Sequence, residues 1–336
     1  MINRILYLGY YLKKLDRPLF FKFLNHVSQK EGISKSRLIS DAIQSVFKNN
    51  ISLLEYFQFH FYQKDKKERR KWAGTGTMYE YQKKMNPPDK RHILDDKVLF
   101  KEKYKDLLIN TPYSVEELQK SENLKKLKTQ KKIVLKESRG KCGLGTYFLS
   151  SDSPEAENLV AFMQREGYDL AEPYIQQHPD LQRLSPSGVN TVRIITQLDA
   201  DDQVLITGCR QRISVDSHVD NLAAGNLVAP IDLETGVINR PAVFSDITKS
   251  SETTHPVTGV DIVGFQVPFW KECVELALNA ACLHPENRSV GWDIVVTEEG
   301  PGLLEGNHDW CKLVWQLPVG EGLKHMLDQQ LENGRV

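Results

Sequence analysis

Residues 290 to 310, VGWDIVVTEEGPGLLEGNHDW, predict a β-hairpin that constrains both the fold and the chemistry of this chain. Two largely apolar arms flank the turn EEGPG, which is typical of a tight connection between antiparallel strands. Side chains alternate along a strand, so we expect Glu305 and Asn307 on one face, with Gly306 leaving the other side uncrowded. The turn then folds Asp293 back beside Glu305 and Asn307.

These three side chains indicate a metal site. Asp293, Glu305 and Asn307 supply two carboxylates and an amide oxygen, which suit Mg²⁺ or Mn²⁺. Proteins usually hold Mg²⁺ with one or two carboxylates plus substrate phosphates. The hairpin therefore predicts a nucleoside triphosphate as a ligand. A surface hairpin with solvated acids is the alternative for this pattern taken alone.

Charge is unevenly distributed along the chain. The 336 residues carry 44 basic and 44 acidic side chains, but residues 1 to 130 have 27 basic against 15 acidic and residues 131 to 336 have 17 against 29. A basic first part can meet nucleic acid, an anionic membrane surface or the acidic remainder of its own chain. Lysine runs are most often a solvated face. We therefore expect no nucleic-acid partner and favour contact within the chain, with peripheral membrane contact as the alternative.

The cysteines and the first residues indicate a cytoplasmic protein. The five cysteines lie far apart and form no CxxC pair, which excludes the common zinc and dithiol motifs and suits reduced thiols. Residues 1 to 24 contain two apolar stretches interrupted by charges, so they predict neither a signal peptide nor a spanning helix. An amphipathic helix there either packs on its own domain or lies on the inner face of the membrane.

The periodicity of the apolar residues changes near residue 93. Residues 34 to 50 carry one helical stripe, residues 51 to 72 suggest a further helix, and AGTG and NPPDK are breaks. A helix over 94 to 108 is followed by a mixture of strands and helices, which predicts an α+β chain. The expected strands cover 132–136, 145–149, 170–176, 191–198, 203–213 and the two arms of the closing hairpin. The expected later helices cover 154–167 and 268–283.

A candidate phosphate-binding flap lies in the middle of the chain. Lys136 ends a short apolar strand and precedes the glycine-bearing turn ESRGKCGLG and a second strand. Such a flap lays backbone N–H groups over phosphates, and a lysine at its root can reach a phosphate oxygen. It is not a Walker loop, because no GK[ST] opens a helix. A plain hairpin turn is the alternative. Further along, Glu172 in LAEPYI is suited to accept an adenine amino group.

Arginines on two later strands predict an anion clamp. Arg193 lies in an apolar, β-branched strand and therefore needs a partner, either in a functional site or in a core ion pair. Arg210 and Arg212 share a face by period two and join Arg193 as candidates for binding phosphate or an acyl-phosphate oxyanion. The segment HVDNLAAGN then places Asp220 and Asn221 in a loop that either holds substrate or only makes a turn.

Seven segments in this order resemble the ATP-grasp superfamily: LDDK, IVLK with its glycine-rich flap, EPYI, NTVRIIT, RQRIS, DNLAAGN and the D…ExN hairpin. The segments VNTVRIIT, VDNLAAGNLVAPID, HPVTGVDI and WDIVVTEEGPGLLEGN are similar to the branch of sugar-transfer-associated ATP-grasp proteins. The resemblance covers roughly residues 92 to 320. It implies an ATP-grasp fold, in which two α+β subdomains grip ATP, preceded by a helical N-terminal module. The expected domains are residues 1–91, the helical module; 92–176, the small lid subdomain; and 177–336, the metal- and substrate-binding subdomain.

The resemblance also implies a role for each matching residue. Lys97 and Lys136 would hold the α- and β-phosphates under the flap from Ser138 to Gly145. The expected nucleotide-binding residues are Lys97, Lys136, Ser138, Gly143, Gly145, Glu172, Tyr174 and Ile175. Glu172 would meet the adenine amino group, and the backbone of Tyr174 and Ile175 would complete the purine slot.

The remaining roles concern metal and acceptor. Asp293, Glu305 and Asn307 would carry two Mg²⁺ ions, with Mn²⁺ as an alternative. Arg193 would stabilise the transferred phosphoryl group, and Arg210 and Asn221 would line the acceptor side. Gly225 is followed by Asn226, where many ATP-grasp ligases have paired glycines, so the sequence of this loop departs from the pattern of those ligases. His255 is expected to be an ordinary loop histidine.

The function implied is that of a Mg²⁺- and ATP-dependent ligase. It would activate a small-molecule carboxylate as an acyl phosphate and join it to an amine or hydroxyl, in the biosynthesis of surface polysaccharide or of a sugar conjugate. No side-chain nucleophile is needed for such chemistry, because positioning and charge neutralisation carry it. The alternatives are a kinase on the same scaffold, which transfers the γ-phosphate to a hydroxyl, and a binding module without turnover.

Overall fold

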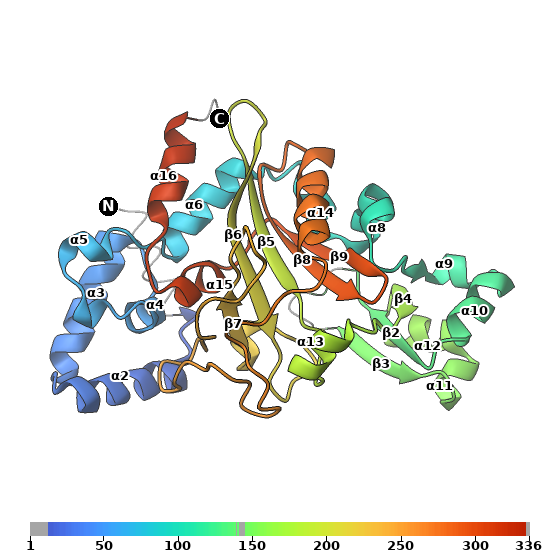
Figure 1. Cartoon of the computed structure of the whole chain (residues 1–336), viewed down its shortest axis with the longest axis horizontal. Coiled ribbons are helices and arrows are strands. Elements are labelled where there is room, and N and C mark those ends of the chain that lie inside the picture. Colours follow the sequence, from blue (N-terminus) through green and yellow to red (C-terminus); the bar gives the residue numbers. More distant parts are fainter. Residues whose placement is uncertain (1–12, 139, 141–144, 334–336) are drawn as a thin grey trace.

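Three regions lie side by side in the computed structural model, which describes residues 13–138, 140 and 145–333. Figure 1 shows a group of helices from the first part of the chain at one end, a five-stranded sheet in the centre and a four-stranded sheet at the other end. The two sheets are antiparallel throughout. The chain is therefore of the α+β class, as predicted.

The first region is a set of helices around an aromatic core. Its helices are α2 Arg17–Glu31, α3 Lys35–Asn49, α4 Leu53–Gln58, α5 Lys66–Arg69 and α6 Thr75–Met85. Asp16 caps α2 by accepting from the Leu19 N–H, and Ser52 and Glu55 form a capping box on α4. Phe23, Phe57 and Phe59 are fully buried where these helices meet.

The helix expected over residues 51 to 72 is broken into pieces. After α4 the chain forms a 3₁₀ turn, Phe61–Gln63, and then the short α5. His60 takes a left-handed conformation, with φ of 53°, which ends the helical path because continuous α-helix requires negative φ. The apolar pattern is satisfied all the same, since Tyr56, Phe59 and Phe61 pack into one core from these separate pieces.

The smaller sheet has helices on one face. Its strands are β1 Tyr113–Ser114, β2 Lys132–Lys136, β3 Thr146–Ser150 and β4 Leu170–Pro173, in the order β1-β4-β2-β3. The accompanying helices are α9 Val115–Leu118, α10 Ser121–Lys128, α11 Pro154–Glu157 and α12 Leu159–Glu166. Ile133, Leu135 and Leu149 point into the core against these helices, as period-two alternation requires. The opposite face is left to contribute to the cavity described below.

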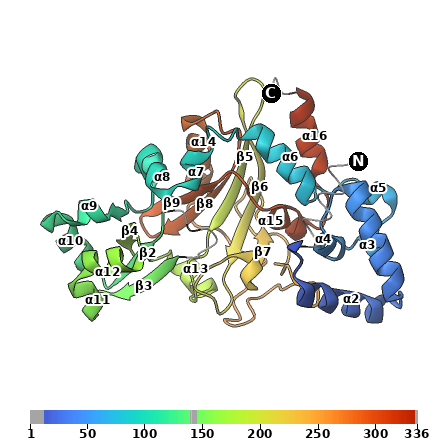
Figure 2. The ribbon, with the colours of Figure 1, turned by 180° about the vertical axis from the view of Figure 1, so that it is seen from behind.

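The larger sheet is covered on both faces. Its strands are β5 Val192–Leu198, β6 Val204–Ile213, β7 Leu227–Pro230, β8 Ser289–Thr297 and β9 Gly300–Asn307, in the order β7-β6-β5-β8-β9. Helix α14, Trp270–Leu283, packs on one face. The other face meets α6 with α15 Lys312–Gln316 and α16 Lys324–Asn333, as seen from behind in Figure 2. Every residue of the central strand β5 is therefore buried, including the polar Arg193, Thr196 and Gln197, each of which has a hydrogen-bond partner.

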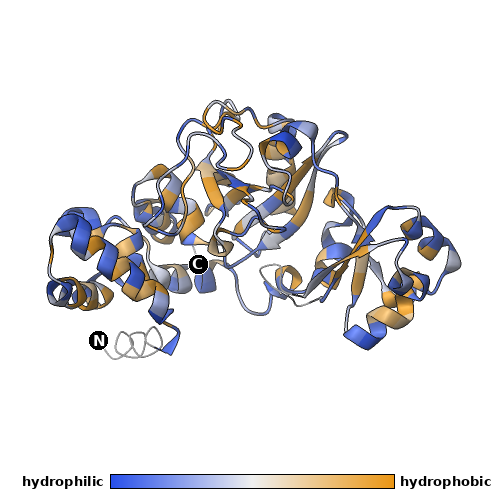
Figure 3. Cartoon of the chain, turned by 90° about the horizontal axis from the view of Figure 1, so that it is seen from below, coloured by the Kyte–Doolittle hydropathy of each residue, from blue (hydrophilic) through white to orange (hydrophobic). Residues whose placement is uncertain are grey.

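Short elements connect these regions. They are α7 His92–Asp95, α8 Lys97–Tyr104, α13 Pro179–Leu184 and the 3₁₀ turns Lys105–Leu107, Leu222–Ala224 and Leu317–Val319. Residues 231 to 266 form isolated bridges instead of named strands. Apolar and polar residues are interspersed along the helices and strands in Figure 3, and no helix of the described residues has the length and hydrophobicity needed to cross a bilayer.

The strands predicted for the second part of the chain are found close to their expected bounds, except 170–176, where the strand ends at Pro173. The helix expected over 268–283 is found as α14. The helix expected over 94–108 is divided at Asp96 into α7 and α8 and ends in a 3₁₀ turn, and the helix expected over 154–167 is divided at Asn158 into α11 and α12. Strands β1 and β7 and helices α15 and α16 had no clear signal. The structural regions resemble the predicted domains, but the boundaries 1–91, 92–176 and 177–336 stay a prediction.

Candidate functional site

A cavity of about 720 Å³ brings together most of the predicted site residues. It is lined by both sheets and by the N-terminal helices. Its volume lies within the range of typical small-molecule sites. The predicted residues on its wall are Lys97, Lys136, Glu172, Tyr174, Ile175, Arg193, Asn221, Asp293, Glu305 and Asn307.

Two of the predicted metal ligands form a row with Arg193 across three neighbouring strands. Arg193 of β5 lies opposite Asp293 of β8, and Asp293 lies opposite Glu305 of β9. Residues directly opposite each other in a sheet point to the same face. The register shifts immediately after this pair, where Ile294 pairs with Leu303, so Leu304 is an extra residue. Such bulges occur next to active sites, where they redirect side chains.

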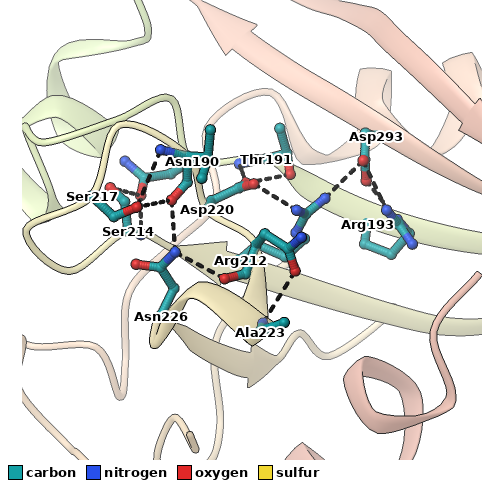
Figure 4. A network of polar contacts seen from close by, with 12 residues as sticks. Asn190, Thr191, Arg193, Arg212, Ser214, Ser217, Asp220, Ala223, Asn226 and Asp293 are labelled. Atoms are coloured by element: carbon teal, nitrogen blue, oxygen red, sulfur yellow. Dashed lines mark hydrogen bonds and ion pairs between the residues drawn. The ribbon is translucent and has the colours of Figure 1, made fainter. Parts of the chain in front are cut away.

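Asp293 is held by two guanidinium groups. Arg193 donates to both of its carboxylate oxygens, at 2.5 and 2.8 Å, and Arg212 donates to Oδ2 at 2.7 Å. Burial alone would raise the pKa of Asp293, but the two guanidinium groups outweigh it and hold that pKa well below its usual range. Figure 4 shows Arg193 and Arg212 converging on this carboxylate. A buried arginine needs a partner, and the partner of Arg193 is thus Asp293.

Glu305 and Asn307 complete a donor set that fits a divalent cation. The Asn307 amide nitrogen lies 3.2 Å from Glu305 Oε1 and 3.5 Å from Asp293 Oδ2, so the three side chains share one face as predicted. Burial and the neighbouring Asp293 carboxylate raise the pKa of Glu305, because both disfavour its charged form, whereas a bound cation would favour it. Within the described residues no cluster of three His, Cys, Asp or Glu side chains suits a metal. The candidate set therefore depends on two carboxylates and one amide, as Mg²⁺ sites with bound phosphates do.

Gly306 corrects one expectation from the sequence. Its outer face is not uncrowded, because a Cβ there would lie 2.7 Å from the Trp292 ring and 3.1 Å from Leu94. Trp292 is fully buried on the far face of the sheet and donates its indole N–H to Thr196. Glycine is needed at 306 so that β9 can pass over this ring while Glu305 and Asn307 face the cavity.

A second carboxylate extends the charge network toward the loop after β6. Arg212 bridges Asp293 and Asp220, with 2.7 Å to an oxygen of each. Asp220 also accepts from the backbone N–H and the hydroxyl of Thr191, at 2.7 and 2.5 Å. Burial, with a further contribution from Asp293, raises the pKa of Asp220. For Arg212, burial is outweighed by the carboxylates of Asp220, Asp293 and Glu305, so its pKa is raised. The network in Figure 4 therefore joins the metal site to the loop.

Arg210 does not reach the cavity wall. It lies opposite Arg193 in the register of β5 and β6, but its guanidinium donates to the carbonyl oxygens of Trp315 and Cys209. Helix α15 covers it, and burial lowers its pKa to about 10. The alternation of side chains along the strand correctly places Arg210 and Arg212 on one face. However, α15 covers Arg210, so only Arg212 lines the cavity. The expectation that Arg210 lines the acceptor side is therefore replaced by Arg212.

The loop after β6 is built around Asn221 and Asn226. Asn221 lines the cavity, and its side-chain oxygen accepts from the Ala223 N–H at 3.1 Å. Gly225 takes a φ of 89°, which is suited to glycine. Asn226 is fully buried and cross-links the loop through Val215 N–H at 2.7 Å and the Val219 carbonyl at 2.6 Å. A second glycine is thus not required here, because an asparagine side chain fixes the loop.

His255 has a structural role in the same region. Its Nδ1 accepts from the backbone N–H groups of Val257 and Thr258 at 3.3 and 3.1 Å. Nε2 lies 2.9 Å from the Ser214 carbonyl oxygen and therefore donates to it. The buried ring ties the HPVTG segment to the end of β6, in keeping with an ordinary loop histidine.

The predicted nucleotide residues lie on the small-sheet side of the cavity. Lys136 and Glu172, on the adjacent strands β2 and β4, form an ion pair. Lys97 donates to the carbonyl oxygens of Glu137 and Gly140, and burial lowers its pKa. Tyr174 and Ile175 follow Glu172 along the same wall. Two cationic side chains therefore meet at the root of the flap, beside a carboxylate.

The flap itself is described only in part. Ser138 donates its N–H to Asp169 at 2.7 Å, and Gly145 has a φ of 73°. Neither Ser138 nor Gly145 lies on the cavity wall, whereas Gly140 and Thr146 do. Gly143 lies outside the described residues.

Two cavity residues from distant parts of the sequence were missed. Glu55 of α4 and Lys312 at the start of α15 form an ion pair of 2.8 Å and both line the cavity. The sequence contains a capping-box pattern at Ser52 and Glu55, but that pattern predicts only a helix start. Nothing in the spacing relates Glu55 to a lysine that follows the closing hairpin.

The comparisons with known proteins point to one family. The model described as sugar-transfer associated ATP-grasp matches residues 77–332. No curated protein matches the chain. Similar solved structures include D-alanyl-alanine synthetase A from Vibrio cholerae, with 13% identity, 73% of this chain, 68% of that chain and a TM-score of 0.43. Biotin carboxylase from Campylobacter jejuni is 13% identical, and the match covers 75% of this chain and 49% of the carboxylase, with a TM-score of 0.46. N5-carboxyaminoimidazole ribonucleotide synthetase from Thermus thermophilus is 14% identical, and the match covers 66% of this chain and 48% of the synthetase, with a TM-score of 0.40. The chain spans about half the length of the latter two.

Proposed function

The chain belongs to the sugar-transfer associated ATP-grasp family, and from this membership and its cavity we propose that it is a Mg²⁺- and ATP-dependent ligase. It would activate a carboxylate as an acyl phosphate and join it to an amine or hydroxyl. The observation that carries the proposal is the row Arg193, Asp293 and Glu305 on one cavity wall, facing Lys136 and Glu172 on another. The predicted metal ligands and the predicted nucleotide residues thus line one cavity.

The proposed roles follow the geometry of the wall. Glu172, Tyr174 and Ile175 would bind adenine, and Lys97 and Lys136 would bind phosphate oxygens. Asp293, Glu305 and Asn307 would hold Mg²⁺, which when bound supplies neutralisation of charge on the β- and γ-phosphates. Arg193 and Arg212 carry positive charge beside this position and would orient the transferred group. The number of ions and the use of Mn²⁺ remain part of the proposal.

The reaction would proceed in two steps. A substrate carboxylate oxygen attacks the γ-phosphorus, the bond from phosphorus to the β–γ bridging oxygen breaks, and ADP leaves with that electron pair. The acceptor nitrogen or oxygen then attacks the acyl carbon, and the bond from that carbon to the phosphate oxygen breaks. Phosphate leaves with the electron pair, and the acceptor loses its proton to solvent. Positioning and charge neutralisation suffice for both steps.

One observation favours this ligase over a kinase that acts on a hydroxyl. A hydroxyl nucleophile requires a base to take its proton. Asp220, the carboxylate on the loop side of the cavity, is already occupied by Thr191 and Arg212. In the step that consumes ATP, a carboxylate nucleophile needs no base, because it is already negatively charged.

Hydroxylamine trapping tests the proposal. Purified protein, ATP and Mg²⁺ would be incubated with amino acids and uronic acids in the presence of hydroxylamine, with the Glu305→Gln variant as a matched control. We expect an acyl hydroxamate, ADP and phosphate from the wild-type protein with at least one acid, and none from the variant. A stable phosphorylated product without hydroxamate would establish the kinase instead.

The wider setting is also part of the proposal. The family description refers to sugar transfer, and we propose a sugar-conjugate acceptor for the acyl group in polysaccharide biosynthesis, in the cytoplasm, where ATP is available. Amino sugars supplied in place of hydroxylamine test the acceptor. Contact of the basic N-terminal part with an anionic membrane face is tested by flotation of the full chain with anionic and with neutral vesicles.

A further inference from the structure

A buried ion pair joins the N-terminal helices to the cavity. Lys312 Nζ lies 2.8 Å from Glu55 Oε1, and the side chains are 20% and 2% exposed respectively. Lys312 is therefore the more exposed partner. Both residues line the same cavity as Asp293 and Glu305, so this pair belongs to the wall of the site.

Glu55 is saturated, whereas Lys312 has donors to spare. The Glu55 carboxylate accepts from the backbone N–H of Ser52 at 2.8 Å, from the N–H of Thr75 at 2.9 Å and from its hydroxyl at 2.6 Å, besides Lys312. Among the described residues Lys312 has Glu55 as its one acceptor, although an ammonium group carries three donors. Burial alone would lower the pKa of Lys312, but Glu55 more than offsets it and the pKa is raised. Lys312 is thus a fixed cation with unused hydrogen-bond donors.

Lys312 lies close in sequence to the predicted metal site and lines the same cavity. Lys312 follows Asn307 by five positions, so their Cα atoms are at most about 18 Å apart. The wall of the cavity that Lys312 lines also carries amide, hydroxyl and apolar side chains, among them Gln58, Asn221, Leu222, Ser245, Leu313 and Val314, besides the carboxylates of Asp16, Asp220 and Asp309. The cations Lys97 and Lys136, predicted to bind phosphates, lie on the small-sheet side instead.

We propose that Lys312, held in place by Glu55, is the recognition site for the carboxylate of the acid substrate, an inference that rests on the proposed ligase function. The pair has no net charge, so binding one carboxylate leaves a single negative charge there, whereas a diphosphate would leave more. The N-terminal helices thereby become part of the substrate site, because Glu55 comes from α4.

The same ion pair also tethers the helices to α15, and a matched control separates the two roles. Gln316 of α15 bonds to Ala73 through its side-chain oxygen at 3.0 Å and its nitrogen at 2.9 Å. Gln316 is fully buried and does not line the cavity. Gln316→Met therefore weakens the tether without changing a side chain of the cavity wall. Its one contact with Lys312 is to the backbone, where the Gln316 amide nitrogen lies 3.5 Å from the Lys312 carbonyl oxygen.

Binding of simple acids tests the proposal. The full-length wild-type protein, Lys312→Met, Lys312→Arg and Gln316→Met would be titrated calorimetrically with a panel of uronic acids and amino acids, including D-glucuronate and L-alanine, and separately with Mg²⁺-ATP. We expect at least one acid to bind the wild type and to bind Lys312→Met roughly ten- to hundredfold more weakly, which is the effect of losing a charge-assisted hydrogen bond. Lys312→Arg should recover part of the affinity, and ATP affinity should change less than about twofold, which is below 0.5 kcal/mol.

The outcomes distinguish this subsite from the ligase proposal. If no acid binds the wild type, if binding survives in Lys312→Met, or if Gln316→Met loses it equally, the subsite is refuted. Lys312-dependent binding without hydroxamate would keep the subsite and reject the ligase. Hydroxamate formation with an unchanged KM for the acid in Lys312→Met would keep the ligase and reject the subsite.

Discussion

Asp293 lies directly opposite Arg193 across β8 and β5, and the two side chains form a bidentate ion pair with distances of 2.5 and 2.8 Å. The carboxylate is 1% exposed and also binds Arg212. A proposed metal ligand is therefore also the centre of a buried charge network. Glu305, the other proposed carboxylate ligand, has a single hydrogen-bond donor among the described residues, Asn307. The two carboxylates should respond differently to neutralisation.

Neutralising either carboxylate should abolish ATP turnover, with opposite effects on stability. Asp293→Asn leaves two buried guanidinium groups without their shared carboxylate, so the free energy of unfolding should fall by about 3 kcal/mol. Glu305→Gln removes a buried carboxylate that Asp293 repels, so the free energy of unfolding should stay equal or rise. Urea denaturation at neutral pH measures both. Equal destabilisation by the two substitutions would contradict the network.

Glu172 should govern the choice of nucleotide. In Glu172→Ala the adenine amino group loses its predicted acceptor, so the affinity for Mg²⁺-ATP should fall roughly tenfold or more and the preference for ATP over GTP should diminish. Calorimetric titration with each nucleotide measures this. The exposed neighbour Glu137 gives the control, because Glu137→Ala should leave the preference unchanged. An unaltered preference in Glu172→Ala would show that Glu172 does not recognise adenine.

Gly306 should resist substitution because of Trp292. A Cβ at 306 would come within 2.7 Å of the ring, so Gly306→Ala should reduce the free energy of unfolding by about 1–3 kcal/mol. The double variant with Trp292→Leu should lose less than the sum of the two single variants, since the smaller side chain makes room. Thermal and urea denaturation of all four proteins complete the cycle. Strict additivity would show that the ring is not the obstacle.

The Glu55 ion pair should give the chain a defined sensitivity to acid. Burial would raise the pKa of Glu55, but Lys312, Thr75 and Ser52 together lower it. A carboxylate with a lowered pKa stabilises the fold above its unfolded pKa of about 4.3 and loses that contribution as pH falls through its folded pKa. The difference in unfolding free energy between the wild type and Glu55→Gln should therefore be constant from about pH 7 to pH 5 and shrink below about pH 4. A difference that grows toward low pH would contradict this prediction, because it would mean that folding raises the pKa of Glu55.

Local patterns in the sequence predicted most of the strands of the two sheets. Strand β2 was expected at its observed bounds, and the alternation along β9 correctly placed Glu305 and Asn307 on one face, because these features depend only on neighbours along one strand. The breaks around His60 and the short β1 were missed. These depend on packing between helices and on pairing with β4, which local periodicity does not contain.

The site was predicted residue by residue but not as a network. Motif order identified Arg193, Asp293 and Glu172 as site candidates, and all three line the same cavity. Period two could not distinguish Arg210 from Arg212, since the covering by α15 is a tertiary contact. Glu55 and Lys312 are separated by most of the chain, and no spacing rule relates them.

Oxygen transfer from the acid would test the proposed acyl phosphate. Once an acid that supports turnover is identified, it would be labelled with ¹⁸O in its carboxylate and incubated with the protein, ATP, Mg²⁺ and hydroxylamine, and the released phosphate would be analysed by mass spectrometry. Our account predicts one ¹⁸O atom in each phosphate released from fully labelled acid, because the acyl C–O bond breaks in the second step. Phosphate released without label during product formation would contradict an acyl-phosphate ligase.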